Sequence, residues 1–242
     1  MQNKKAEKDF FDSFVEDGEY DVFDETGTIR ILDELRNLAG TGSSSRLRML
    51  DVGCGTGAFT RRFADKNADV FGVDISHKST VLAGKVAPEC SFFTGDAECL
   101  PFGNESLDIV LFSGVLHHLP SMEGALSECN RVLKPGGRFV GFDPNGRNPA
   151  MWLYRSSSSP LATRKGWTEN ERLLVKEEIH TALIHAGFSD VTVKGISGVS
   201  YRYIGSKLAM KALGIYNVFD KALDRIGLAD RYGSFLISCG QK

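Results

Sequence analysis

The sequence of 242 residues has few cysteines, no excess of charge of either sign and no long apolar run. Its five cysteines are scattered and include no C-x-x-C pair, which argues against a disulfide framework or a zinc knuckle and favours a reducing compartment. No run approaches about 18 apolar residues, so we expect no membrane span. The charged N-terminus lacks the apolar core of a signal peptide. These absences predict a cytoplasmic protein without a metal site.

The charges nearly balance, with 29 Lys and Arg against 31 Asp and Glu and a formal net charge of -2. A general nucleic-acid binder usually carries a basic excess, and the sequence shows no basic groove with interleaved aromatics. We therefore expect no nucleic-acid partner. Hydrophobic residues make up 42% of the chain, which is enough apolar surface to offset the entropy of ordering. The length fits one domain with elaborations.

Short apolar runs that predict strands alternate with stretches of helical spacing. The predicted strands are 49–52, 69–74, 91–94, 107–112, 137–142, 191–193 and 234–238, and the predicted helices lie within 1–40 and at 58–66, 78–85, 122–133, 168–186 and 204–228. Such alternation requires crossover connections and therefore a parallel sheet with helices on both faces. The sequence predicts a doubly wound α/β fold.

The segment LDVGCGTG at 50–57 lies on a predicted strand-to-helix turn. Glycines let the backbone pass close to a ligand, and the N-terminus of the following helix would direct N–H groups at it. The spacing Gly53-x-Gly55-x-x-Ala58 also satisfies a loose dinucleotide fingerprint. By itself the loop therefore leaves a nicotinamide-dependent oxidoreductase open.

Acidic residues around the loop favour a different ligand. Asp51 precedes the glycines, where its carboxylate would repel a pyrophosphate but attract a cation. Asp74 ends the second predicted strand, where a carboxylate can accept hydrogen bonds from ribose hydroxyls. Asp96 and Ala97 follow the third strand and can read an adenine edge. Together these residues indicate a nucleoside with a positively charged tail.

At this point the sequence resembles the class I S-adenosylmethionine-dependent methyltransferases, in the branch of small-molecule and ubiquinone or menaquinone biosynthesis enzymes. The matching segments are LDVGCGTG at 50–57, VFGVDIS at 70–76, GDAECLPF at 95–102, LDIVLFSGVLHHL at 107–119 and LKPGGRF at 133–139. The resemblance implies a Rossmann-like seven-stranded sheet of order 3-2-1-4-5-7-6 whose last strand is antiparallel. It also implies S-adenosylmethionine as cofactor and S-adenosylhomocysteine as product.

The resemblance further implies a role for individual positions. Asp51 with Gly53, Gly55 and Gly57 would hold the methionine portion, and Ser113 or Gly114 would contact its amine. Asp74 would bind the ribose, Ile75 would pack on the adenine, and Asp96 and Ala97 would bind its edge. Tyr20 resembles the N-terminal aromatic that closes over the cofactor.

Two residues are candidates for a general base, because a hydroxyl nucleophile commonly needs one while an amine must only arrive neutral. His118 follows the fourth predicted strand, and the alternative is that it packs in a helix-entry element. Asp143 ends the fifth strand, and the alternative is an Asx turn. These candidates favour O-methylation of a small organic acceptor. N- or C-methylation, a lipid-like acceptor and a non-catalytic binding protein remain alternatives.

The two ends of the chain are expected to cover the cofactor half. We expect one domain with a helical N-terminal cover at 1–46, a cofactor half at 47–142 and an acceptor half at 143–242 with a lid at 200–230. The helix predicted at 204–228 has Lys207, Lys211, Lys221 and Arg225 beside its apolar stripe, and a basic amphipathic helix can touch a membrane. Asp220 and Asp224 dilute this charge, so a lid packed on the sheet is favoured. We expect a monomer or homodimer.

Overall fold

Seven strands form a single sheet in the part of the chain that the structure describes. The computed structural model describes residues 4–16, 23–40, 46–64, 66–156, 168, 170–201 and 207–242. The strands are β1 (Leu47–Val52), β2 (Ala68–Asp74), β3 (Ser91–Thr94), β4 (Leu107–Ser113), β5 (Leu133–Pro144), β6 (Ser189–Ile196) and β7 (Phe235–Gln241). Their order is β3-β2-β1-β4-β5-β7-β6. β1 to β5 pair in parallel, and β7 is antiparallel to both β5 and β6, which confirms the predicted topology.

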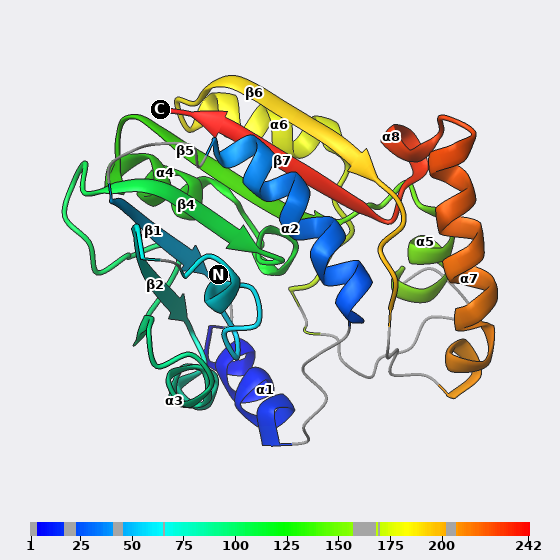
Figure 1. Cartoon of the computed structure of the whole chain (residues 1–242), viewed down its shortest axis with the longest axis horizontal. Helices are drawn as coiled ribbons and strands as arrows, with labels where there is room; N and C mark the ends of the chain where they lie inside the picture. The colour runs from blue at the N-terminus through cyan, green and yellow to red at the C-terminus, as the bar shows by residue number, and fades with distance from the viewer. Residues whose placement is uncertain are drawn as a thin grey trace.

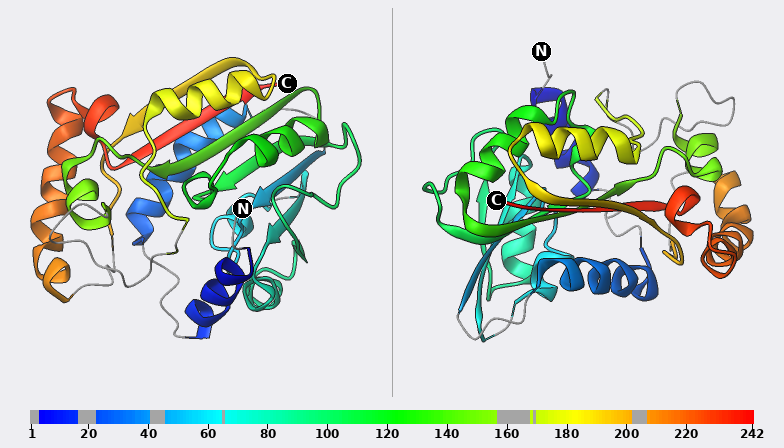
Figure 2. Two further views of the ribbon diagram at one scale, coloured as in Figure 1. Left: turned by 180° about the vertical axis from the view of Figure 1, so that it is seen from behind. Right: turned by 90° about the horizontal axis from the view of Figure 1, so that it is seen from above.

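Helices cover both faces of this sheet. They are α1 (Lys4–Glu16), α2 (Glu25–Ala39), α3 (His77–Val86), α4 (Glu123–Val132), α5 (Pro149–Arg155), α6 (Lys176–His185), α7 (Lys207–Arg225) and α8 (Ala229–Tyr232). Two short 3-10 turns, η1 (Thr60–Arg62) and η2 (Leu116–His118), follow β1 and β4. Figure 1 shows α2 across the front of the sheet, and Figure 2 shows α4 and α6 on the opposite face.

The alternation of side chains along β4 builds a core on each face. Val110 and Phe112 belong to the cluster on the side of α4 and α6, whereas Ile109 and Leu111 belong to the cluster on the side of α2. Successive side chains of a strand point to opposite faces, so a strand buried on both faces must be apolar throughout. The uniformly apolar runs in the sequence are explained by this double burial.

Two predicted helices are shorter than the sequence indicated. The segment predicted as a helix at 58–66 forms only η1, where the Thr60 hydroxyl is bonded to the carboxylate of Asp51. The helix predicted from 168 begins at Lys176, because Leu174 instead makes a parallel bridge to Asn145 after β5. Helical spacing of apolar residues was present in both segments, but contacts with the sheet edge decide their backbone.

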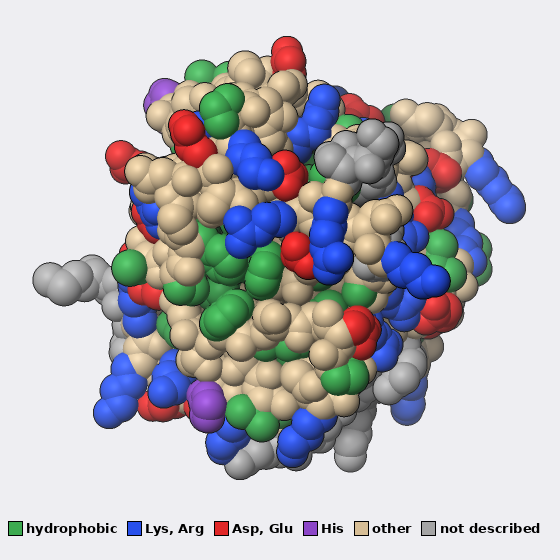
Figure 3. Space-filling view, turned by 60° about the vertical axis from the view of Figure 1, so that its left-hand side comes forward, with side chains coloured by type: hydrophobic (Ala, Val, Ile, Leu, Met, Phe, Trp, Pro, Cys, Tyr) green, Lys and Arg blue, Asp and Glu red, His purple; other side chains and the backbone are tan. Residues whose placement is uncertain are grey.

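One face of the molecule carries side chains of both charges. The face seen when the left-hand side of Figure 1 is turned forward carries Lys and Arg side chains interspersed with Asp and Glu around a group of hydrophobic ones (Figure 3). This mixture agrees with the near balance of 29 basic and 31 acidic residues in the chain.

Replacing Phe112 with alanine should test the core on the side of α4 and α6. The side chain is fully buried and its ring centroid lies 5.5 Å from that of Phe139. We expect Phe112→Ala to lower the free energy of unfolding by about 3–5 kcal/mol, measured by urea denaturation. Val81→Ala, on the exposed side of α3, should change it by less than about 0.5 kcal/mol. Equal effects of the two substitutions would contradict this account of the core.

Candidate active site

A cavity opens at the carboxyl edge of the sheet, where the loops after β1, β2, β3 and β4 converge on α1. Open parallel sheets bind ligands at this edge. Most of the site residues predicted from the sequence line this cavity, namely Gly53, Asp74, Ile75, Asp96, Ala97, Ser113 and His118. Segments that are separated by long stretches of sequence are therefore brought to one place by the parallel topology.

The glycine loop after β1 needs glycine for two reasons. Gly53, Gly55 and Gly57 all have positive φ, at 69°, 52° and 79°. A Cβ on Gly53 would also lie 1.9 Å from Cγ2 of Val115, so the loop after β4 can approach only because a side chain is absent. Gly53 lines the cavity, whereas the other two glycines shape the turn behind it.

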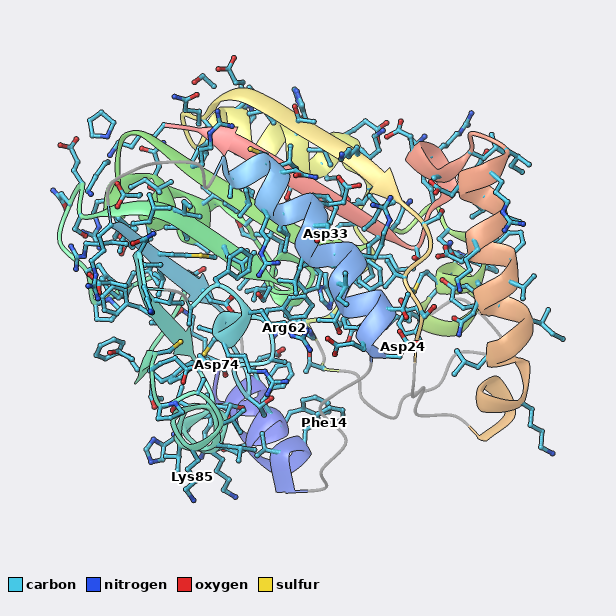
Figure 4. All side chains as sticks on the ribbon, viewed as in Figure 1. Phe14, Asp24, Asp33, Arg62, Asp74 and Lys85 are labelled. Carbon is cyan, nitrogen blue, oxygen red and sulfur yellow. The ribbon has the colours of Figure 1, made fainter. Side chains whose placement is uncertain are left out.

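Asp74 ends β2 and faces the cavity from the loop beside α1 (Figure 4). Its two carboxylate oxygens accept hydrogen bonds of 2.8 Å from the backbone N–H groups of Gly55 and Ser76. Burial raises the pKa of Asp74 to about 6, although these two bonds act in the opposite direction. The bonds tie β2 to the glycine loop and fix the direction in which the carboxylate points.

Asp51 lies beneath the loop and is not among the residues that line the cavity. Its side chain has no exposed surface, and its carboxylate accepts hydrogen bonds of 2.6 Å from the hydroxyls of Thr60 and Ser113. Burial raises the pKa of Asp51 to about 7. Of the two hydroxyl partners, Ser113 is the one that reaches the cavity. The methionine-binding role predicted for Asp51 stays a prediction, and in this arrangement it would act through Ser113.

Helix α1, within the helical cover predicted at 1–46, forms one wall of the cavity through side-chain contacts that the sequence did not indicate. Lys4 Nζ lies 2.5 Å from Asp96 Oδ2 and 2.6 Å from Glu98 Oε2. Near the other end of the helix, Asp12 Oδ1 accepts a hydrogen bond of 2.6 Å from the Ser76 hydroxyl. These contacts hold α1 across residues that follow β2 and β3. The sequence predicted a helical cover in this segment but not the residues through which it is held.

His118 lines the cavity and is held by α1. Its Nδ1 lies 3.2 Å from Glu7 Oε1 and 3.3 Å from the hydroxyl of Thr168. Burial tends to raise the pKa of Glu7, but its contacts with His118, Thr168 and Asn170 outweigh this and hold that pKa below its usual value. An ionised Glu7 therefore faces the imidazole. Sequence reasoning missed Glu7 because one acid on a charged helix gives no signal of its partner.

Asp143 lies away from the cavity, in contrast to the acceptor contact considered for it. It is fully buried. Its Oδ1 accepts a hydrogen bond of 3.1 Å from the backbone N–H of His117 and lies 2.8 Å from His117 Nδ1, also within hydrogen-bond distance. The burial raises the pKa of Asp143 well above its usual value and lowers that of His117. The carboxyl group thus anchors η2, and neither acceptor contact nor the alternative Asx turn describes its bonds.

Tyr20, the predicted aromatic cover, lies outside the described residues. Among the described ones, no group of three or more His, Cys, Asp or Glu side chains is placed to hold a metal ion. Burial raises the pKa of the Cys54 thiol well above its usual value, so this cysteine in the glycine loop is not a reactive thiolate at neutral pH.

The charges around the cavity suit a cation that carries a nucleoside. Glu7, Asp74 and Asp96 place three carboxyl groups on its wall, while Ile75 and Ala97 add apolar surface. The loop of glycines brings backbone rather than side chains to the same place. This donor set fits a ribose, an adenine edge and a positively charged tail. The sheet order and the cavity at its carboxyl edge place the chain among Rossmann-like α/β enzymes.

Comparison with known proteins narrows this class. Residues 50–141 match the family model described as a methyltransferase domain. An uncharacterised methyltransferase of Synechocystis sp. is 34% identical over 177 residues, which cover 72% of this chain and 80% of that protein. The chain belongs to the S-adenosylmethionine-dependent methyltransferases, and S-adenosylmethionine is its cofactor. This assignment decides against the nicotinamide-dependent oxidoreductase that the glycine spacing allowed.

Two further relatives carry more specific names. A demethylmenaquinone methyltransferase of Renibacterium salmoninarum is 30% identical over 172 residues, covering 62% of this chain and 70% of that protein. A ubiquinone biosynthesis O-methyltransferase of Roseobacter denitrificans is 33% identical, covering 66% of this chain and 67% of that protein. Among solved structures, a possible histamine N-methyltransferase of Thermotoga maritima has a TM-score of 0.66 at 21% identity, covering 97% of this chain and 99% of that one, and shows the same fold.

The raised pKa values of Asp74 and Asp51, about 6 and about 7, predict a pH-dependent affinity for the cofactor. A cationic sulfonium favours ionised carboxylates, so affinity should rise as both groups lose their protons between about pH 5 and pH 8. Calorimetric titration with S-adenosylmethionine across this range would measure the effect. Asp74→Asn should flatten the dependence, whereas Asp33→Asn on the exposed face of α2 should not. A flat profile for the unaltered protein would contradict the prediction.

Proposed function

We propose that this enzyme methylates a hydroxyl oxygen of a small organic acceptor, with His118 as the general base. The observation that carries the proposal is the pairing of His118 with Glu7 on the wall of the cavity, 3.2 Å apart. The relative named as an O-methyltransferase supports oxygen as the methylated atom. The relative named for demethylmenaquinone keeps methylation of a carbon on a lipid-like acceptor as the alternative.

The proposed cofactor position follows the lining of the cavity. Ser113, with Asp51 behind it, and the glycine loop would hold the methionine portion. Asp74 would bind the ribose hydroxyls, and Ile75 would pack on the adenine. Asp96 would accept from the adenine edge, with Ala97 beside it. A carboxylate has about four lone-pair sites, so Asp96 can keep Lys4 and still accept this bond.

The chemistry required of the protein is alignment and removal of one proton. The cofactor would supply a methyl group bonded to a sulfonium sulfur. The leaving group is then a neutral thioether, which needs no further activation. A neutral hydroxyl is a poor nucleophile, so a base that takes its proton during the transfer raises the rate. With Nδ1 facing Glu7, the Nε2 atom of His118 is the one that would accept that proton. The Glu7 carboxylate would then stabilise the imidazolium and hold the ring in the required tautomer.

Helix α1 contributes to this chemistry by closing the site. Phe11 lines the cavity, and its ring centroid lies 5.2 Å from that of His118 in an edge-on contact. An apolar ring beside the base excludes water from the place where the hydroxyl must approach. We propose that residues 47–142 hold the cofactor, that α1 covers it, and that residues 143–242 supply the acceptor side, where α5 and α7 lie next to each other (Figure 1).

Replacing the proposed base should separate turnover from cofactor binding. We expect His118→Gln to lower kcat by about 10²–10⁴, the usual contribution of a general base, while the Kd for S-adenosylmethionine changes little. Turnover would be measured with a radiolabelled methyl donor against small hydroxyl compounds, and Kd by calorimetry. His180→Gln, on the exposed side of α6, is the matched control. Unchanged turnover of His118→Gln would remove this residue from the mechanism and favour an amine or carbon acceptor.

Replacing Glu7 should reveal its positioning role through the pH profile. Glu7→Gln keeps the shape of the side chain and its contact with Asn170 but removes the charge opposite His118. We expect a lower kcat, because a less basic imidazole accepts the proton less readily. We also expect a pH–rate profile displaced toward lower pH, because the imidazolium loses a stabilising partner and therefore loses its proton at lower pH. The decisive readout is a change in the apparent pKa of kcat.

Glu98→Gln is the matched control for Glu7→Gln, because Glu98 also contacts a basic partner of α1 but lies outside the cavity lining. It should leave the apparent pKa of kcat in place. A Glu7→Gln enzyme whose kcat falls with no change in the pH profile would show that Glu7 supports the packing of α1 and does not act through His118.

A further inference from the structure

Helix α7 has one face packed on the protein and one apolar face exposed to solvent. Its inward side is formed by Leu213, Asp220 and Leu223, which are all buried. On the outward side, Ile215 is 77% exposed, Val218 70% and Phe219 42%, and Ile226 directly after the helix is 64% exposed. With 3.6 residues per turn these four side chains share one side of the helix. Exposure of this extent at four neighbouring apolar positions indicates a surface that another body covers.

The same outward side is basic. Lys211, Lys221 and Arg225 are exposed and lie along the apolar residues at helical spacing. The expectation that Asp220 dilutes this charge is wrong, because its carboxylate turns inward and accepts hydrogen bonds from the backbone N–H groups of Gly198, at 2.6 Å, and Val199, at 3.2 Å. In the described part of α7, Asp224 is the exposed acid that remains. The outward face is therefore positive in a chain whose net charge is -2.

We propose that this outward face of α7 lies on the surface of an anionic membrane. Aliphatic and aromatic side chains of an interfacial helix enter the boundary between headgroups and acyl chains, and Lys and Arg beside them pair with anionic headgroups. A second copy of the chain fits less well, because stacking two such faces would bring Lys211, Lys221 and Arg225 against their own counterparts. The contact is peripheral, since no helix among the described residues has the length and apolarity to cross a bilayer.

The position of α7 would allow a membrane contact to deliver acceptors to the site. The helix lies between β6 and β7, and β7 begins opposite Pro144 at the carboxyl end of β5. It therefore occupies the same edge of the sheet as the cavity, next to α5 (Figures 1 and 2). A bilayer beneath α7 would bring lipid-like acceptors to the acceptor side of the site. This use rests on the proposed function, whereas the membrane contact itself does not.

Vesicle co-sedimentation of the full chain tests the contact without any activity measurement. We expect the protein to sediment with vesicles of phosphatidylcholine and phosphatidylglycerol at low salt, and far less with phosphatidylcholine alone. Ile215→Glu/Val218→Glu should weaken the partition at least about tenfold. Lys221→Gln/Arg225→Gln should weaken it by roughly twenty-fivefold, or about fivefold per charge. Ile184→Glu/Val86→Glu, at exposed apolar positions on α6 and α3, adds the same charge elsewhere and should bind as the unaltered protein does.

Several results would overturn the proposal. These are no sedimentation with anionic vesicles at low salt, equal binding to both kinds of vesicle, or equal weakening by the α7 and control double variants. A dimer in sedimentation velocity that Ile215→Glu/Val218→Glu dissociates, without vesicle binding, would instead assign the face to a second copy. Circular dichroism melting curves would confirm that the variants are folded. Because no acceptor is needed, failure here leaves the O-methylation proposal to its own test.

Discussion

The buried carboxylate of Asp51 joins three parts of the chain, and the floor of the site depends on it. Asp51 is the next-to-last residue of β1, just before the glycine loop. Its carboxylate accepts a hydrogen bond from Thr60 after that loop and another from Ser113 at the end of β4. A buried acidic group without partners is costly, so these two hydroxyls and the strands that carry them must keep their positions. Asp74 performs a similar task one strand away by binding the backbone of Gly55. The cavity is thus built on carboxylates whose raised pKa values follow from the burial that makes them structural.

In the proposed mechanism, helix α1 would both cover the cofactor and take part in the chemistry. Lys4 and Asp12 fasten the helix to residues after β3 and β2, and between them Glu7 reaches His118. In this proposal, covering the cofactor and orienting the base would therefore be tasks of one helix. The adjacent pair His117 and Asp143 has a separate task, since it is buried and fixes the turn that presents His118. Two histidines that are neighbours in the sequence thus have different environments.

On the acceptor side, a buried carboxylate likewise fixes the position of a helix, in this case α7. Asp220 binds the backbone after β6 and so fastens the helix to the sheet, which leaves the outward side to its apolar and basic residues. A helix that keeps exposed apolar residues on its outward side as well as buried leucines on its inward side is unusual for a protein that meets only water. In the proposed arrangement the cofactor half faces α1 and the acceptor half faces a bilayer, so the two substrates would reach the cavity from different sides.

The sequence by itself determined the alternation of strands and helices, and its resemblance to a known family implied the strand order. It also determined most of the cavity lining, because motifs at the carboxyl ends of parallel strands must meet at one edge. It could not place α1, since helical spacing identifies a shared face but not the surface that the face meets. Lys4 and Asp96, for example, are 92 residues apart in the sequence, and only the fold of the chain brings their side chains into contact. For the same reason the sequence suggested a solvent-facing Asp220 and an accessible Asp143. Only the tertiary structure showed that both are buried, because burial depends on which segments pack over a residue and not on its neighbours along the chain.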